Sequence, residues 1–179
     1  MSVSSPVGVG IIGCGSIAKA YFTACKRFPF LAVTACADLR MEAAEARAAE
    51  FVCRALTVDA LLADAGISIV INLTIPQAHA EIDLRILNAG KHVFSEKPFA
   101  LTRAEGEAVV ARAAELGLRV GCAPDTCMGA ATQTCRKLID DGEIGTPVAF
   151  QANMVGGGHE TWHPSPEFYY KRGGGPMFD

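Results

Sequence analysis

The stretch that decides the fold is Val7 to Ala18, which reads Val-Gly-Val-Gly-Ile-Ile-Gly-Cys-Gly-Ser-Ile-Ala. Its first half is rich in β-branched residues and ends at Gly13, as a buried strand does. The residues that follow, as far as Cys25, have the composition of a helix. Gly13 and Gly15 place a tight turn between the two. We therefore expect a strand, a turn and a helix in direct succession.

The same alternation of strand and helix continues along the chain. Apolar runs typical of buried strands lie at 31–37, 67–73, 92–95 and 118–122, and segments of helical composition lie at 41–51, 77–88, 103–116 and 128–141. Thr102 and Glu105 have the spacing of a capping box at the start of the third of these helices. This order predicts an α/β protein with a doubly wound parallel sheet covered by helices on both faces.

Composition narrows the class of protein. The 179 residues carry a net charge of −3 and half of them are hydrophobic, which is typical of a globular chain whose core needs neither disulfides nor a structural metal. Without a basic excess, nucleic acid is not an expected partner. No segment approaches the ~20 apolar residues that span a bilayer. The seven cysteines are odd in number and form no Cys-x-x-Cys pair, so we expect a reduced, cytoplasmic protein that contacts no membrane.

The turn after the first strand has the features of a dinucleotide site. Gly13-Cys-Gly15-Ser-Ile-Ala is a Gly-x-Gly-x-x-Ala pattern in which Gly15 lets the backbone approach a pyrophosphate, and Ser16 and Ile17 open the helix whose N–H groups attract phosphate. Asp38 ends the second apolar run, twenty residues after the pattern, where a carboxylate can accept hydrogen bonds from ribose hydroxyls. This favours NAD. Arg40 leaves NADP open, because it could pair with a 2′-phosphate or stack on adenine.

Polar residues follow the next two predicted strands. The segment from Thr74 through Pro76 to His79 comes after the run at 67–73, and Glu96-Lys97-Pro comes after the strand at 92–95. Both therefore lie at the carboxyl edge of the sheet, where open α/β sheets bind ligands. The Lys97 ammonium could orient a reacting hydroxyl or carbonyl, stabilise negative charge or relay a proton. The alternative is an ordinary loop lysine in water.

Taken together, these motifs resemble the Gfo/Idh/MocA oxidoreductases, named for glucose-fructose oxidoreductase and inositol dehydrogenase. The similar features are Gly-x-Gly-x-x-Ala, an acidic residue ending the second strand, Thr-x-Pro-x-x-x-His and Glu-Lys-Pro. The resemblance covers essentially the whole chain. The resemblance implies a Rossmann domain followed by an α/β domain that supplies the substrate pocket and the interface of a homo-oligomer. It also implies hydride transfer between a nicotinamide and a sugar, cyclitol or related polyol.

The resemblance further implies roles for individual residues. Glu96 would contact the nicotinamide ribose, Lys97 would be the catalytic lysine, and Thr74, Pro76 and His79 would line the cofactor cleft. The family's second domain opens with a glycine run and an aspartate, which matches the stretch ending at Asp179 and makes that residue the second catalytic candidate. The position of the family's catalytic histidine comes after it.

The last third of the chain carries further substrate candidates. His159, Trp162 and His163 lie in a loop whose glycines and proline oppose the helix that would align two histidines on a metal, so we expect substrate contacts and no metal. Asp125 follows the strand at 118–122 and is either a further substrate contact or an ordinary loop carboxylate.

These motifs predict two domains. We expect residues 1–125 to form an NAD(P)-binding Rossmann domain, and residues 126–179 to hold a linking helix, a strand at 147–155 and the start of a truncated substrate and oligomerisation domain. In full-length form this would be a dehydrogenase, while the isolated chain would be inactive. One alternative is a non-catalytic nucleotide-sensing protein, and another, a methyltransferase using the same glycine turn, would not explain Glu-Lys-Pro after the strand at 92–95.

Overall fold

A computed structural model describes residues 5–123, 126–153, 155–163, 166–171 and 174–175 of the chain. The chain forms two compact units, Met1–Ala123 and Pro124–Asp179. The roles expected of residues 1–125 and 126–179 stay predictions.

The first unit is built on a six-stranded sheet in which every neighbouring pair of strands is parallel. The strands are β1 (Val7–Ile12), β2 (Leu31–Ala37), β3 (Arg54–Leu56), β4 (Ile69–Asn72), β5 (His92–Ser95) and β6 (Val120–Cys122). Their order across the sheet is β3-β2-β1-β4-β5-β6, so the succession of strands reverses between β1 and β4. Open α/β sheets bind ligands outside the carboxyl ends of the strands at such a reversal. The predicted Rossmann sheet is confirmed.

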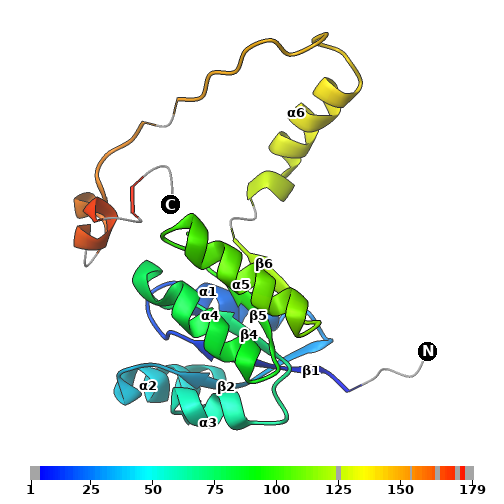
Figure 1. The fold of residues 1–179 in the computed structure, drawn as a ribbon. Coiled ribbons are helices and arrows are strands. Elements are labelled where there is room, and N and C mark those ends of the chain that lie inside the picture. Colours follow the sequence, from blue (N-terminus) through cyan, green and yellow to red (C-terminus); the bar gives the residue numbers. More distant parts are fainter. Residues whose placement is uncertain (1–4, 124–125, 154, 164–165, 172–173, 176–179) are drawn as a thin grey trace. The chain divides into compact units, whose positions relative to one another are not determined.

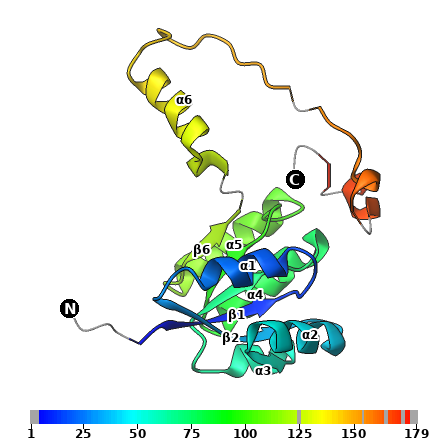
Figure 2. The same ribbon diagram turned by 180° about the vertical axis from the view of Figure 1, so that it is seen from behind.

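Helices cover both faces of this sheet and enclose two separate cores. The helices are α1 (Ala18–Cys25), α2 (Met41–Phe51), α3 (Val58–Ala63), α4 (His79–Asn88) and α5 (Arg103–Glu115). One core joins α1 and α2 to the sheet through residues such as Phe22, Ala44 and Ile11. The other joins α3, α4 and α5 to the opposite face through residues such as Leu61, Ile86 and Val109. Accordingly, α4 and α5 lie in front of the sheet in Figure 1, and α1 lies in front in Figure 2.

The glycines inside β1 allow the neighbouring chain to approach closely. A Cβ on Gly8 would lie 1.8 Å from the carbonyl oxygen of Gly66, and a Cβ on Gly10 would lie 2.8 Å from the Leu61 side chain. These two glycines are two residues apart and therefore face the same side of the sheet. The intervening Val9 fills the opposite core. The alternating valines and glycines thus give β1 one bulky face and one closely approached face.

Several predicted elements have the bounds expected of them. The strands at 31–37 and 92–95 and the helix at 41–51 begin and end where predicted. The capping box of α5 is confirmed, because Thr102 Oγ1 accepts from the Glu105 N–H (3.2 Å) and the Glu105 carboxylate accepts from the Thr102 N–H (2.9 Å). The expectation missed β3 and α3, so the run at 67–73 contains the fourth strand and not the third. Both missed elements are short, and three or six residues carry too little periodicity to be recognised.

The second unit holds α6 (Ala130–Asp140) and the 3₁₀ turns η2 (Thr126–Met128), η3 (His159–Thr161) and η4 (Pro166–Tyr170). The strand expected at 147–155 is wrong: none of the described residues in that range is in a strand, and Val148, Phe150 and Val155 are each more than 90% exposed. A strand needs a hydrogen-bonded neighbour, and the described residues of this unit supply none. In the part of the chain that the structure describes, no helix is both long and apolar enough to span a membrane.

Candidate cofactor site

The glycine-rich turn lies between the carboxyl ends of three strands. Gly13 has φ +99°, and its N–H donates to the carbonyl oxygen of Ala37 at the end of β2 (2.8 Å). A Cβ on Gly13 would lie 2.5 Å from the carbonyl oxygen of Leu73, which follows β4. Gly15, by contrast, has no atom within 4 Å of the Cβ position, and Ser16 and Ile17 beside it are exposed. The first glycine therefore makes the turn possible, and the second leaves open the side on which a pyrophosphate would bind.

Asp38 fastens the turn to the end of β2. Its Oδ2 accepts the N–H of Cys14 (2.8 Å) and its Oδ1 accepts the N–H of Arg40 (2.9 Å). An ionised carboxylate has about four acceptor positions, so two remain for the hydroxyls of a ribose. The Arg40 side chain is exposed just beyond it. Asp38 thus holds the turn in place, which the sequence did not indicate. It also keeps acceptor positions for a ribose, which the sequence did indicate.

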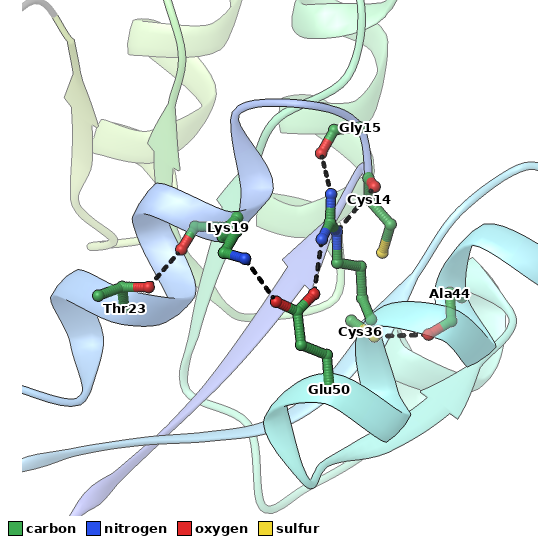
Figure 3. A network of polar contacts seen from close by, with 8 residues as sticks. Cys14, Gly15, Lys19, Thr23, Cys36, Ala44 and Glu50 are labelled. Carbon is green, nitrogen blue, oxygen red and sulfur yellow. Dashed lines mark hydrogen bonds and ion pairs between the residues drawn. The ribbon is translucent and has the colours of Figure 1, made fainter.

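A charged network from α2 holds the other side of the turn, as Figure 3 shows. Arg47 donates to the carbonyl oxygens of Cys14 (Nε, 3.4 Å) and Gly15 (Nη2, 3.3 Å), and its Nη1 lies 2.7 Å from Glu50. Lys19 of α1 lies 3.0 Å from the same carboxylate, and both cations lower the pKa of Glu50. The Arg47 guanidinium thus satisfies both carbonyl oxygens of the turn. The Glu-to-Arg spacing on α2 indicates only an intrahelical pair, so no sequence signal points to this contact.

The thiols beside the turn are packing groups. Cys53 Sγ lies 3.8 Å from Cys36 Sγ, and the Cys14 thiol is 3.6 Å from the Ala37 carbonyl oxygen. Hydrogen bonding to Cys14 raises the pKa of Cys36 to about 12, and the same contact lowers the pKa of Cys14. Cys14 and Cys36 are buried and all three are free. They fill space between the turn, α2 and the sheet, as small hydrophobic side chains do.

The loop after β5 approaches α1 through Glu96. Glu96 Oε1 accepts the Tyr21 hydroxyl (2.7 Å), and Oε2 accepts the N–H of Lys97 (2.9 Å). The Glu96 N–H in turn donates to the carbonyl oxygen of Asn72, the last residue of β4 (2.9 Å). Glu96 and Lys97 are half-buried, and the Lys97–Pro98 peptide bond is cis. The structure therefore fixes the Glu96 carboxylate beside the helix that begins at the glycine-rich turn, with Tyr21 as a contributor that the sequence did not reveal.

The segment after β4 contains two half-buried candidate residues and one buried one. Thr74 and Pro76 are half-buried at the carboxyl edge of the sheet, where they were expected. His79 is 1% exposed, and its ring nitrogens contact the carbonyl oxygens of Pro98 (Nδ1, 2.6 Å) and Thr74 (Nε2, 2.9 Å). That His79 lines the cofactor cleft stays a prediction, and in this structure its ring is buried. The imidazole is enclosed by the backbone of the two loops.

The residues expected to contact substrate in the last third of the chain form a small aromatic cluster of their own. The His159 ring stacks on Tyr169 at 3.6 Å between centroids and is tilted against Trp162 at 4.7 Å, while Trp162 is exposed. His163 lies 6.3 Å from His159. Asp125 and Asp179 lie outside the described residues. Among the residues that are described, no group of three or more His, Cys, Asp or Glu side chains could hold a metal ion.

Comparison with known proteins agrees with this geometry. Residues 7–123 match the family model described as "Oxidoreductase family, NAD-binding Rossmann fold", named GFO_IDH_MocA. The chain belongs to the Gfo/Idh/MocA oxidoreductase family. The matched region begins at β1 and ends just after β6, so it contains the whole sheet and every residue of the candidate cofactor site.

Several family members are similar to the chain over most of its length. The inositol 2-dehydrogenase of Rhizobium meliloti is 31% identical over 97% of this chain and 51% of its own length. The 1,5-anhydro-D-fructose reductase of Ensifer adhaerens is 31% identical over 78% of this chain and 43% of its own length. The solved structure of KijD10, a 3-ketoreductase from Actinomadura kijaniata in complex with NADP, has a TM-score of 0.73 and 31% identity over 79% of this chain and 46% of its own. This chain therefore spans about half the length of the Gfo/Idh/MocA proteins it matches.

Proposed function

We propose that this chain is the cofactor-binding part of an NAD(H)-dependent oxidoreductase that transfers hydride between the nicotinamide and a carbon of a cyclitol, sugar or related polyol. One observation carries the proposal. The open glycine-rich turn, the Asp38 carboxylate and the Glu96-Lys97 pair all lie at the carboxyl edge of one sheet, around the reversal of strand order between β1 and β4. This is where an open α/β sheet binds a dinucleotide.

The residues of the site have separable roles in this proposal. The N–H groups around Gly15 and the start of α1 bind the pyrophosphate, and Asp38 accepts from the adenosine ribose. Glu96, held by Tyr21, contacts the nicotinamide ribose. When bound, the nicotinamide supplies the hydride acceptor or donor. Lys97 orients the substrate oxygen, stabilises the negative charge that develops on it and relays its proton.

The substrate class comes from the relatives. One is named as a dehydrogenase of inositol, a cyclitol, and another as a reductase of 1,5-anhydro-D-fructose, a sugar derivative. Both substrates present several adjacent hydroxyl groups, and this chain shares 31% of its aligned residues with each protein. We extend the proposal to a cytoplasmic homo-oligomer in which residues 126–179 begin the substrate domain. No observation favours the alternative of a non-catalytic nucleotide sensor, since these relatives are named as enzymes.

The first prediction concerns the choice of cofactor. NADH is expected to bind more tightly than NADPH, because the Asp38 carboxylate accepts from a 2′-hydroxyl and repels a 2′-phosphate. Asp38→Asn keeps an oxygen to accept the Cys14 N–H and removes the charge, so it should narrow the difference between the two cofactors without opening the turn. Fluorescence titration of both reduced cofactors against both forms of the protein measures this.

The outcome also separates Asp38 from Arg40. Tighter NADPH binding by the unaltered protein would show that Arg40 governs the ribose site, and Arg40→Ala is the matched variant for that result. Steady turnover of a panel of cyclitols, sugars and polyols by the full-length protein tests the reaction itself. Cofactor binding with no turnover of any of them would favour the sensor.

A further inference from the structure

A buried polar network lies beneath the loops that follow β4 and β5. Asn72 and Ser95 are the last residues of these strands, and His79 and Asp83 are one turn apart on α4; all four are at most 1% exposed. Asn72 and Ser95 are register partners in the parallel sheet, so their side chains point to the same face. That face is the one covered by α4, through Ile82 and its neighbours.

His79 joins the two loops that carry the candidate site. Its Nδ1 lies 2.6 Å from the carbonyl oxygen of Pro98, and its Nε2 lies 2.9 Å from the carbonyl oxygen of Thr74. A neutral imidazole has one N–H and can donate to only one of these oxygens. The lone pair of its second nitrogen would then face the lone pairs of the other oxygen at hydrogen-bond distance. Both contacts are favourable only when the ring carries two protons.

A buried positive charge needs a negative partner, and Asp83 is placed to supply it. Asp83 is four residues beyond His79, on the same face of α4. Its Oδ1 accepts from Asn72 Nδ2 at 2.7 Å, while its Oδ2 and the Ser95 Oγ have no well-formed hydrogen bond. Burial raises the pKa of Asp83, and the nearby Asn72 and Ser95 side chains and the charge of His79 act against that rise.

The surrounding groups leave Asp83 as the counter-charge of His79. Burial and the negative charges of Asp83 and Glu96 raise the pKa of Cys122 on β6 to about 11, so this thiol is neutral near pH 7. The Glu96 carboxylate is engaged by Tyr21 and by the N–H of the next residue. His79 is also the first residue of α4, where the helix dipole opposes a positive charge.

The same network fixes the backbone around it. Asn72 Oδ1 accepts both the N–H (3.1 Å) and the hydroxyl (2.7 Å) of Thr74, and Asn72 Nδ2 donates to the His79 carbonyl oxygen (3.2 Å). The loop after β4 is thus held by Asn72 from one side and by the His79 ring from the other. The loop after β5 is held by the same ring through Pro98, which directly follows Lys97.

We propose that His79 is a positioning residue: a doubly protonated imidazole, balanced by the Asp83 carboxylate, that binds the Thr74 and Pro98 carbonyl groups and so fixes the backbone next to Lys97. The role of Lys97 toward the substrate rests on the function proposed above. The doubly protonated ring does not, because it follows from contacts within the protein alone.

The protonation of His79 is tested by nitrogen-15 NMR of the 179-residue chain with labelled histidine rings, at pH 8 and without cofactor or substrate. Replacing His92, His159 and His163 in turn by glutamine assigns the His79 signals without altering the network. Both His79 nitrogens should appear protonated, whereas an ordinary histidine, with a pKa of about 6.5, is neutral at this pH. Asp83→Asn should return His79 to a single neutral tautomer. One bare ring nitrogen in the unaltered chain, or two protons retained in Asp83→Asn, would overturn the proposal.

The positioning role is tested in the full-length protein. His79→Gln can restore only one of the two carbonyl contacts, so kcat should fall by about 10-fold or more while the Kd of NADH changes by less than about threefold. His92→Gln is the matched control, because its ring lies at the opposite end of β5 and accepts the N–H of Arg119 (3.0 Å). A folded His79→Gln protein with unchanged kcat contradicts the role. The NMR result does not depend on turnover, so it distinguishes a failure of this inference from a failure of the proposed function.

Discussion

At the scale of a single residue, the proposed chemistry depends on how the structure holds the backbone of Lys97. Its backbone N–H is bound by Glu96, and the residue after it is bound by His79. The backbone that carries the ammonium is thus held on one side by the side chain of the preceding residue and on the other by a buried side chain of α4. The proposed role of Lys97 requires its ammonium to be placed against a reacting oxygen, and these contacts fix the backbone from which the side chain extends.

Replacing this side chain should affect turnover much more than cofactor binding. In the full-length protein, Lys97→Ala is expected to lower kcat by about 10²-fold or more, the range for a positioned proton-transfer group, with the Kd of NADH within a few fold. Steady-state kinetics with the best substrate of the panel, together with NADH titration, measures both. Lys26→Ala is the control, because Lys26 lies over the Phe51 ring away from the site. A Lys97→Ala protein with the original kcat would remove the lysine from the mechanism.

The residues that sequence reasoning found and those it missed differ in where their partners lie. Asp38, Glu96 and Lys97 stand directly after strands, so their place at the carboxyl edge follows from the alternation of elements alone. Tyr21 and Arg47 sit inside helices, and their partners are 75 and 33 residues away in the sequence. No local pattern encodes such a contact, because it depends on how two helices pack on the sheet.

At the scale of an element, the β1–α1 turn contains one glycine that the fold requires and one that is proposed to serve binding. Gly13 has a positive φ, and a Cβ there would clash with the Leu73 carbonyl group. Gly15 has a Cβ position with nothing around it. The motif does not distinguish the two glycines. The structure shows that the fold itself requires the first, while the second is the one proposed to leave room for a ligand.

Two alanine substitutions should therefore fail in different ways. Gly13→Ala is expected to lower the free energy of unfolding by about 2–4 kcal/mol, from backbone strain and the clash together. Gly15→Ala should change stability by no more than about 0.5 kcal/mol, yet weaken NADH binding by about 10-fold or more, because the new methyl group occupies the side open to the pyrophosphate. Urea denaturation and NADH titration of the pair give the comparison. Equal losses of stability in both variants would contradict this division of roles.

There is also a physical reason why some elements were predicted correctly and others were not. The bounds of α2 and α5 could be predicted because a helix makes its own hydrogen bonds and its ends carry local signals, such as the Thr102 capping box. A strand depends on its neighbours. The apolar run at 147–155 has the composition of a strand, but the described residues of the second unit give it nothing to pair with.

At the scale of the whole molecule, the two units differ in how much hydrophobic core they contain. The first unit contains both buried clusters and the full sheet. In the second, α6 buries none of its residues, and Val148, Phe150 and Val155 are exposed. Such apolar side chains are usually covered, by further chain or by another protein. The chain covers 51% of the inositol 2-dehydrogenase of Rhizobium meliloti and 43% of the 1,5-anhydro-D-fructose reductase of Ensifer adhaerens.

The 179-residue chain is therefore expected to bind dinucleotide without turning it over. In the proposed site the phosphate and ribose contacts come from Gly15, Asp38 and the start of α1, all within the first unit, so binding is expected to need nothing more. Catalysis needs the reacting carbon held about 3–3.5 Å from the nicotinamide by groups on both sides, and only the Lys97 side is present among the described residues. The exposed apolar run should also cause association at high concentration. One purified sample is used for three measurements. NADH titration measures binding, substrate-dependent absorbance at 340 nm measures turnover, and sedimentation measures association. Steady turnover of any polyol by this chain would show that the active site is complete within it.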